Sequence, residues 1–335
     1  MKCIALGPRG GLDRITLVDR PDPGQPGPDD IRVRLHATSL NFHDYKVVTG
    51  DRAHTEGLIP MADGSGVVEA VGERVTEFAA GDHVVSTFFP GWLDGPAPFG
   101  DFKTVPGDGV DGYAREVVVA PATAFTQAPR GWSHAEAATL TTAGVTAWRA
   151  LVADAGLKAG DTILALGTGG VSIVALQIAT AMGATMIITS SSDGKLERAR
   201  ALGATHTVNY RTVPEWGAEV RRLTGGRGVD HVLELGGPGT LAQSIAAARI
   251  GGHISLIGTV TGAGGTVPTA AMMVKQVRLQ GLIVGSRRHQ QQLVRALDVT
   301  GIRPVIDRTF SLAHLADAFR YEESGAHFGK IVVEY

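Results

Sequence analysis

The stretch TILALGTGGVSIVALQIATAMGA, residues 162–184, decides the fold of this chain. In it an apolar run ends at a glycine-rich turn, and a helix-forming segment follows near Gly170. Gly167 and Gly169 fill the first two positions of the pattern G-x-G-x-x-G, and Ser172 stands at the third. The first glycine permits a tight turn, the second lets a pyrophosphate approach the backbone, and the third position needs a small side chain. The stretch therefore predicts a strand–turn–helix unit that binds a dinucleotide, although a purely structural turn is the alternative.

The sequence on either side of this stretch divides the chain into two parts. From residue 161 onward, short apolar runs such as MIITS, HVLEL and HISLIG alternate with helical segments. This rhythm predicts a parallel sheet with helices on both faces. Residues before about 125 read as strands and turns, as does the final run FGKIVVEY. We expect a doubly wound parallel sheet over 126–282, inserted into a mainly β domain built from 1–125 and 283–335.

Composition and charge exclude several classes of partner. The 335 residues carry a formal net charge of -2, which gives no electrostatic reason to expect nucleic acid or an anionic membrane. We find neither a signal peptide nor an apolar stretch of about 18 residues, so we expect a cytoplasmic protein. The single cysteine, Cys3, excludes an internal disulfide and a multi-thiolate metal site.

The stretch TSSSDGK, residues 189–195, follows the second predicted strand of the parallel sheet. A site for NAD usually carries a carboxylate here, which binds the 2′-hydroxyl of the ribose and would repel a 2′-phosphate. This chain instead has hydroxyls at Ser190 and Ser191 and a cation at Lys195, which suit a phosphate. Asp193 lies too far along the chain for the usual acid, and we expect it to cap the next helix. The pattern favours NADP(H), unless Lys195 is an ordinary surface lysine.

Several segments in order resemble the medium-chain dehydrogenase/reductase superfamily, in particular its zinc-independent branch of quinone-oxidoreductase-like and NADP-dependent alcohol-dehydrogenase-like proteins. They include VVEAVGERVTEFAAGDHVV, LTTAGVTAWRAL, ALGTGGVSIVALQIA, TGGRGVDHVLELGGPGTL and FGKIVVEY, and the resemblance spans nearly the whole chain. It implies that a Rossmann cofactor domain is inserted into a GroES-like catalytic domain, with a cleft between the two. It also implies hydride transfer between a nicotinamide and a small carbonyl, quinone or activated alkene, or the corresponding alcohol.

Zinc-dependent relatives have three catalytic ligand positions, which in this sequence are matched by Asn41, Ala62 and Thr142. None of these residues is a usual zinc ligand, and a chain with one cysteine has no counterpart of the relatives' four-cysteine structural site. His43 and Asp44 cannot readily join Asp63 in a substitute site, because the side chains of neighbouring residues point in different directions. We therefore expect no metal. A zinc alcohol dehydrogenase and a non-catalytic NADPH-binding or structural protein are the two alternatives.

The resemblance brings five side chains to the nicotinamide: Asn41, His43, Asp44, Tyr45 and Thr142. Of these we predict Asn41, His43, Tyr45 and Thr142 to be catalytic. The Asn41 amide could donate a hydrogen bond to a carbonyl oxygen. His43 could supply a proton near neutral pH, or be an ordinary, partly buried imidazole. Asp44, in the same segment, either assists the chemistry or anchors the local backbone. A loop rich in glycine and proline, residues 88–112, is expected at the surface, lining the substrate entrance.

The expected cofactor contacts combine the glycine-rich turn, the serine-rich segment and positions that the resemblance implies. They are Phe42, Thr146, Gly167, Thr168, Gly169, Gly170, Val171, Thr189, Ser190, Ser191, Lys195, Tyr210, Gly236, Ile257, Gly258, Thr259, Ile283, Val284, Gly329 and Lys330. Lys330 is a second cation that could reach a phosphate. The run RLQGLIVG reads as an edge strand, and the resemblance implies that it pairs with a second copy in a homodimer. A free, protected edge is the alternative.

Overall fold

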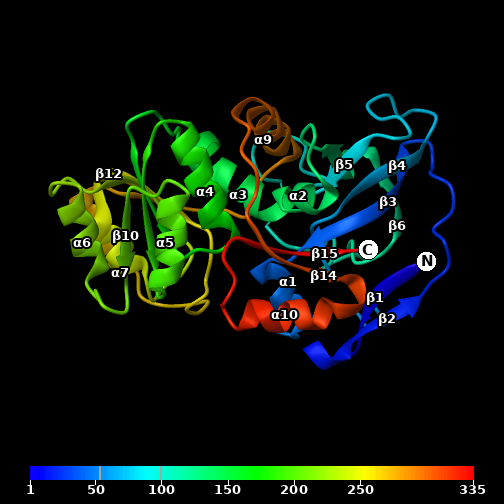
Figure 1. The fold of residues 1–335 in the computed structure, drawn as a ribbon, viewed down its shortest axis with the longest axis horizontal. Coiled ribbons are helices and arrows are strands. Elements are labelled where there is room, and N and C mark those ends of the chain that lie inside the picture. Colours follow the sequence, from blue (N-terminus) through cyan, green and yellow to red (C-terminus); the bar gives the residue numbers. More distant parts are fainter. Residues whose placement is uncertain (53, 99) are drawn as a thin grey trace. The chain divides into compact units, whose positions relative to one another are not determined.

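The computed structural model describes residues 1–52, 54–98 and 100–335 of this α/β protein. The chain forms two compact units (Figure 1): residues 1–145 with 284–335 make unit 1, and residues 146–283 make unit 2. Residues 126–145, which we expected to open the nucleotide-binding domain, pack in unit 1. The reason is that helix α2 (His134–Ala138) lies against strands of the β domain and buries Ala135 and Ala138 beside Ala37 and Val332.

Unit 2 contains one sheet of six parallel strands in the order β10-β9-β8-β11-β12-β13. The strands are β8 (Thr162–Leu166), β9 (Thr185–Ser190), β10 (His206–Asn209), β11 (Val229–Glu234), β12 (Ala248–Leu256) and β13 (Arg278–Gly281). This order places the topological switch between β8 and β11, the point where open α/β sheets bind dinucleotides. The six strands confirm the predicted parallel sheet.

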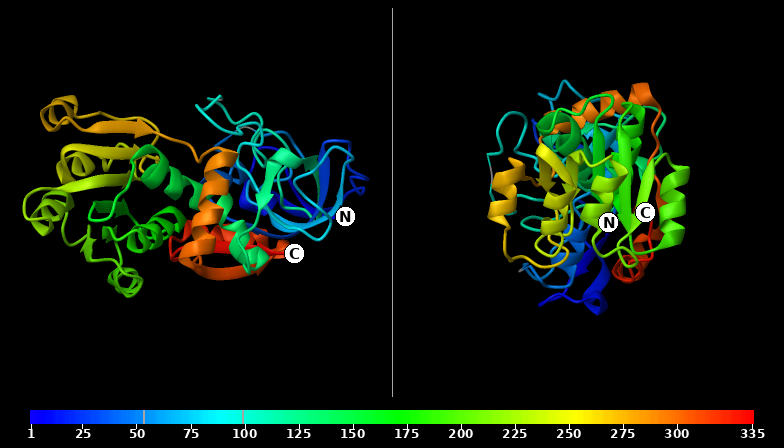
Figure 2. Two further views of the ribbon diagram at one scale, coloured as in Figure 1. Left: turned by 90° about the horizontal axis from the view of Figure 1, so that it is seen from above. Right: turned by 90° about the vertical axis from the view of Figure 1, so that its left-hand side faces the viewer.

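Helices cover both faces of this sheet (Figure 2). They are α4 (Gly170–Ala181), α5 (Asp193–Ala201), α6 (Trp216–Leu223), α7 (Leu241–Ala247) and α8 (Thr269–Lys275), after the short α3 (Val145–Trp148). Because both faces are covered, consecutive side chains of the central strands β8 and β11 are buried rather than alternately buried and exposed. Ile163, Leu164 and Ala165 of β8, for example, are all fully buried.

Unit 1 is built on a mostly antiparallel sheet in the order β14-β15-β3-β4-β5-β7, with β6 also paired to β3. The strands are β3 (Asp30–Ser39), β4 (Ser65–Val71), β5 (His83–Ser86), β6 (Val117–Pro121), β7 (Phe125–Gln127), β14 (Ile306–Ser311) and β15 (Lys330–Glu334). A separate hairpin pairs β1 (Lys2–Leu6) with β2 (Ile15–Asp19), and the remaining helices are α1 (Phe42–Val48), α9 (Arg287–Thr300) and α10 (Leu315–Glu323).

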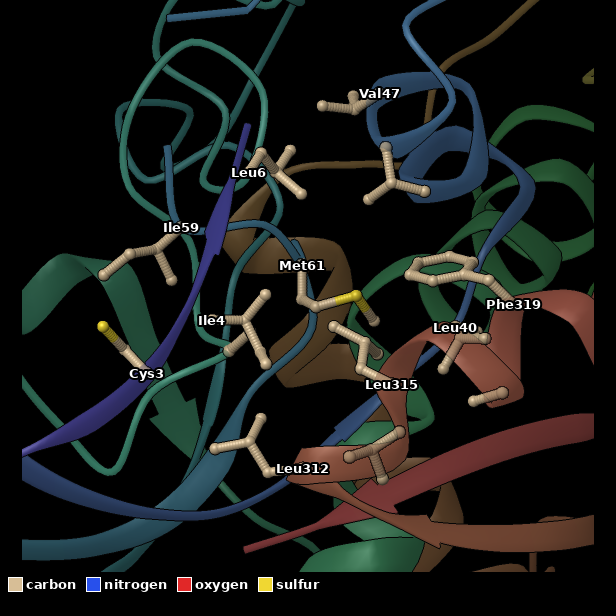
Figure 3. Packing of buried hydrophobic residues seen from close by; sticks show 14 of the residues in the cluster. Cys3, Ile4, Leu6, Leu40, Val47, Ile59, Met61, Leu312, Leu315 and Phe319 are labelled. Carbon is tan, nitrogen blue, oxygen red and sulfur yellow. The ribbon is translucent and has the colours of Figure 1, made fainter. Parts of the chain in front are cut away.

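The hydrophobic core of unit 1 joins segments from both ends of the chain. Ile4 and Leu6 of β1 pack with Met61 and with Leu315 and Phe319 of α10 (Figure 3). This packing explains why the last fifty residues belong with the first rather than with the sheet of unit 2. Over the described parts of the chain, no helix is both long and apolar enough to cross a membrane.

Candidate cofactor and active site

The glycine-rich turn follows β8 as the sequence predicts. Gly167 has a φ of 75°, in the region that favours glycine, and Gly169 directly precedes α4. A Cβ atom added at either glycine would meet no described heavy atom within 4 Å, so these glycines leave open space beside the backbone. Ser172, at the third position, donates its hydroxyl to the carbonyl oxygen of Leu166 at 2.8 Å. The turn thus leaves room for a pyrophosphate at the N-terminus of a twelve-residue helix.

The serine-rich segment continues this edge of the sheet at the end of β9. The backbone N–H of Gly167 contacts Thr189 Oγ1 at 3.4 Å, which ties the two strand ends together. Ser190 is buried and accepts a hydrogen bond from the backbone of Ser192 at 3.3 Å. Ser191, the next residue in the sequence, is partly exposed. The strand end therefore presents hydroxyl groups where an NAD site usually presents a carboxylate.

Helix α5 begins one residue earlier than expected, and Ser192 rather than Asp193 caps it. The Ser192 hydroxyl accepts a hydrogen bond from the backbone N–H of Lys195 at 3.4 Å. Asp193 is the first helical residue, and it accepts a hydrogen bond from the Asn209 amide at 2.8 Å. Serine and aspartate can both cap a helix, but the Asp193 carboxylate is bound by Asn209 at the end of β10. The cap therefore falls to Ser192. Lys195 stands in the first turn of α5, partly buried.

A buried carboxylate that the sequence analysis missed shapes the end of β11. Glu234 is fully buried and accepts hydrogen bonds from the backbone of Gly236 at 2.8 Å and of Gly237 at 2.9 Å. The hydroxyls of Thr240 and Ser244 also donate to it. Glu234 therefore fixes the loop that contains the predicted contact Gly236. The run ELGG offered a signal, because a charged residue that ends a buried strand needs donors nearby.

The other predicted contacts in unit 2 mostly follow neighbouring strands. Thr168 lies in the turn after β8, and Gly170 and Val171 are the first residues of α4; Tyr210 follows β10; Ile257, Gly258 and Thr259 follow β12; Ile283 follows β13; Thr146 is buried in α3. Carboxyl ends of parallel strands share one edge, so most of these residues gather along the edge that contains the switch between β8 and β11.

In unit 1, two of the four predicted catalytic residues, Asn41 and Thr142, contact a carboxylate that the sequence analysis considered only as a metal ligand. Asp63 is fully buried; its Oδ1 accepts a hydrogen bond from Thr142 at 2.6 Å, and its Oδ2 accepts from Ser39 at 2.6 Å and from the Asn41 amide at 2.9 Å. The side-chain nitrogen of Lys330 lies 3.7 Å from Oδ2. These groups come from chain segments far apart, so only the folded chain brings them together.

Asn41 is placed differently from the role we gave it. Its amide nitrogen donates to Asp63 and to Asp44 Oδ2, the latter at 3.0 Å, while its oxygen accepts from Lys330 at 2.5 Å. The amide is thus occupied inside the protein and is not directed at a substrate carbonyl. Asp44 also accepts from the backbone of Ala62 at 3.0 Å, so it anchors local backbone, which is one of the two roles we considered.

Lys330 is likewise directed inward. Its ammonium donates to the carbonyl oxygen of Leu40 and to Asn41 Oδ1, and only 3% of the residue is exposed. The cation therefore lies in the buried cluster, not at a phosphate site. Gly329 before it has a φ of 84°, and a Cβ atom there would overlap the Val305 carbonyl, so this glycine is required by the local backbone.

His43 lies between two carboxylates and two aromatic rings. Its Nε2 lies 3.0 Å from Asp108 Oδ2 and its Nδ1 lies 3.6 Å from Asp44 Oδ1. Burial disfavours the imidazolium, but the two carboxylates outweigh burial and raise the pKa of His43 to about 9. The Asp108 carboxylate also accepts from Arg52 at 2.6 Å. His43 therefore ties α1 to the loop at 105–110 as a cation.

The other predicted residues of unit 1 make contacts outside the Asp63 cluster. Tyr45 donates its hydroxyl to Glu323 of α10 at 2.7 Å, and this bond raises the pKa of Tyr45 to about 12. Phe42 is 40% exposed and stacks on Tyr45. Val284 has a φ of 44°, an uncommon value for a β-branched residue. Thr142 alone among the four catalytic candidates contacts Asp63 directly while remaining partly exposed.

The donor set of this cluster does not fit a zinc ion. Among the described residues there is no group of three or more His, Cys, Asp or Glu side chains that could hold a metal. Asn41, Ala62 and Thr142 stand where zinc-dependent relatives have ligands, and zinc needs about three such ligands. The Lys330 ammonium supplies the buried positive charge beside Asp63.

A doubly wound sheet with this glycine-rich turn, together with a GroES-like domain, is the architecture of nicotinamide-nucleotide-dependent oxidoreductases. Residues 27–130 match the family model of the alcohol dehydrogenase GroES-like domain, and residues 170–299 match that of the zinc-binding dehydrogenases. The chain belongs to the medium-chain dehydrogenase/reductase superfamily of alcohol dehydrogenases and quinone oxidoreductases.

Individual relatives cover the whole length of the chain. The zinc-type alcohol dehydrogenase-like protein C1773.06c of Schizosaccharomyces pombe is 40% identical over 97% of this chain and 96% of its own. A structure from Sinorhizobium meliloti, provisionally named an alcohol dehydrogenase, has a TM-score of 0.92 and 42% identity, over 100% of this chain and 99% of its own. A quinone oxidoreductase of Pseudomonas syringae pv. tomato has a TM-score of 0.84 and 27% identity, over 100% and 99%.

Proposed function

We propose that this protein is a zinc-independent, NADP(H)-dependent oxidoreductase. It transfers a hydride between the nicotinamide and a small carbonyl, quinone or activated alkene, or the corresponding alcohol. The observation that carries the cofactor choice is the end of β9, where Ser190 and Ser191 stand in place of a carboxylate and Lys195 lies in the first turn of the next helix. Hydroxyl donors and a cation stabilise a 2′-phosphate, whereas a carboxylate would repel it.

The contacts of Asp193 support this choice. It is the first acidic residue in the sequence after β9, and its carboxylate accepts a hydrogen bond from the Asn209 amide at 2.8 Å. It therefore has a partner other than a ribose hydroxyl. One similar structure, 35% identical with a TM-score of 0.90, is described as an NAD-dependent alcohol dehydrogenase. That description concerns the neighbour, and our choice of NADP(H) rests on the residues of this chain.

When bound, the nicotinamide supplies or accepts the hydride, and the protein positions the cofactor and the substrate. The turn at Gly167 and Gly169 would hold the pyrophosphate, and Ser190, Ser191 and Lys195 would hold the 2′-phosphate. In unit 1, Thr142 is the predicted catalytic residue whose hydroxyl is best placed to contact a substrate, because Asn41 is occupied internally and Tyr45 is bonded to Glu323.

The test is a fluorescence titration of NADPH and NADH on the wild type and on Lys195→Ala. We expect the wild type to prefer NADPH by about 1–3 kcal/mol, the strength of one or two charge-assisted hydrogen bonds. Lys195→Ala should remove much of this preference and leave NADH affinity nearly unchanged. Lys158→Ala is the matched control, because Lys158 is an exposed lysine before β8, at the opposite end of that strand from the glycine-rich turn. Equal affinities for NADPH and NADH in the wild type would refute the NADP assignment.

We also propose that the protein is a homodimer that pairs through β13. This strand is at the edge of the six-stranded sheet, and the nearby helix α8 exposes Met273 at 73% and Val274 at 71%. An uncovered strand edge beside exposed apolar side chains favours association with a second copy. Light scattering should give a dimer mass for the wild type and a monomer mass for Val274→Asp. Val299→Asp, at the exposed C-terminal end of α9, should remain dimeric.

A further inference from the structure

The Thr142 hydroxyl lies at the point where a buried polar network reaches the surface of unit 1. Asp63, Ser39, Asn41 and Lys330 are all buried, whereas Thr142 is partly exposed. Thr142 belongs to a π-helical turn over Leu140–Gly144. Such turns are rare in proteins as a whole, and those that occur are often at functional sites.

The hydrogen bonds around Thr142 set which role its hydroxyl can play. A threonine hydroxyl has one proton to donate and two lone pairs with which to accept. Its proton is directed at Asp63 Oδ1 at 2.6 Å. The preceding residue, Thr141, donates to the carbonyl oxygen of Ser86 at 2.8 Å and so holds the π-helical turn on β5. Thr142 can therefore accept a hydrogen bond from a ligand while it donates to Asp63.

From this geometry we propose that Thr142 and Asp63 form a proton relay for an alcohol substrate, with Thr142 accepting the alcohol hydroxyl and Asp63 serving as the final base. This inference rests on the proposed function and names one substrate class for it. When bound, the oxidised nicotinamide would accept the hydride that leaves the carbinol carbon, which would supply the two-electron oxidation that the alcohol needs. The alcohol proton passes to Thr142 Oγ1, the original Thr142 proton passes to Asp63 Oδ1, and the carbonyl forms. Carbonyl reduction is the same step reversed.

The charges around Asp63 suit a group that gains and loses a proton. Lys330 on β15 is the nearby cation; Asp44 on α1 and Glu322 on α10 are the other ionisable groups that face this pair. Complete burial raises the pKa of Asp63, and the Lys330 charge opposes that rise. Burial also raises the pKa of Glu322 to about 8. Ser39, Asn41 and Lys330 thus act as positioning residues that hold the Asp63 carboxylate against Thr142.

The first test needs neither cofactor nor turnover. The ¹³C resonance of the Asp63 carboxyl, assigned by its absence in Asp63→Asn, is titrated in the wild type, Thr142→Val and Thr142→Ser. Removing a donor from a carboxylate disfavours its charged form, so Thr142→Val should raise the Asp63 pKa and Thr142→Ser should restore it. Identical titrations in all three proteins would overturn the contact on which the relay depends.

The second test measures kcat with benzyl alcohol and NADP⁺, and separately with benzoquinone and NADPH. We expect Thr142→Val to lower kcat for alcohol oxidation roughly 100-fold or more, with NADP⁺ affinity unchanged, and Thr142→Ser to retain most of the rate. The wild type should show a solvent deuterium isotope effect on kcat. Alcohol oxidation by Thr142→Val at the wild-type rate would overturn the relay, as would a wild type that reduces the quinone but oxidises no alcohol. A wild type inactive with both substrates would overturn the proposed function itself.

Discussion

His43 should make the stability of this protein depend on pH in a way that a single substitution removes. The imidazole is 13% exposed and lies 3.0 Å from Asp108 Oδ2 and 3.6 Å from Asp44 Oδ1. These carboxylates raise its pKa from the ordinary 6.5 to about 9. At about 1.4 kcal/mol for each pKa unit, the difference between the two values corresponds to about 3 kcal/mol of stabilisation.

The sign follows from proton linkage. A group whose pKa is higher in the folded state stabilises the protein fully below its unfolded pKa, and the stabilisation is lost as pH rises through the folded pKa. The His43 contribution should therefore be complete below pH 6.5 and disappear as pH rises from 6.5 to about 9. Glu322, whose burial raises its pKa to about 8, also titrates in this range, so the wild-type curve alone is composite.

The assay is the free energy of unfolding in urea, measured from pH 6 to pH 9.5 for the wild type and His43→Gln. The difference in the free energy of unfolding between the wild type and His43→Gln should shrink by about 3 kcal/mol from pH 6 to pH 9.5. His314→Gln is the control for removal of an imidazole, because that ring contacts the Ser311 hydroxyl rather than a carboxylate. A constant difference between wild type and His43→Gln, together with a His43 ring resonance that titrates near 6.5, would refute the reasoning.

Three further substitutions test the framework of the two units. Gly66→Ala should destabilise unit 1 by about 1–3 kcal/mol in urea unfolding, because the added methyl group would overlap the Arg34 carbonyl in β3. Glu234→Gln should cost about 1–3 kcal/mol and weaken NADPH binding in a titration, because an amide cannot accept all four hydrogen bonds that hold the ELGG loop. Ser133→Ala should lower the free energy of unfolding by about 1 kcal/mol through loss of its capping box with Glu136, and Ser133→Thr should retain most of it.

The sequence by itself determined the features that depend on neighbouring residues. A glycine that needs a positive φ, such as Gly167, is visible in the chain because few other residues tolerate that conformation. Ser133 with Glu136 three residues later predicts a helix start, and the structure confirms it. The sequence also shows that no acidic residue stands directly after β9 and that the zinc-ligand positions hold other residue types. Both can be read from the chain because each depends only on the residue at a known place in a motif.

The tertiary structure alone decided which polar groups meet. Lys330 looked like a cation free to bind phosphate, yet its nearest partners, Leu40 and Asn41, lie almost the whole chain away. The sequence suggested no role for Asp63 beyond a substitute metal site that we did not expect, and folding makes it the acceptor for Asn41 and Thr142. Periodicity and motif spacing report which face of an element is apolar, but not which distant side chain lies opposite a buried charge. That pairing is fixed only when the strands from the two ends of the chain join in one sheet, because a buried charge must then find its donors or a counter-charge there.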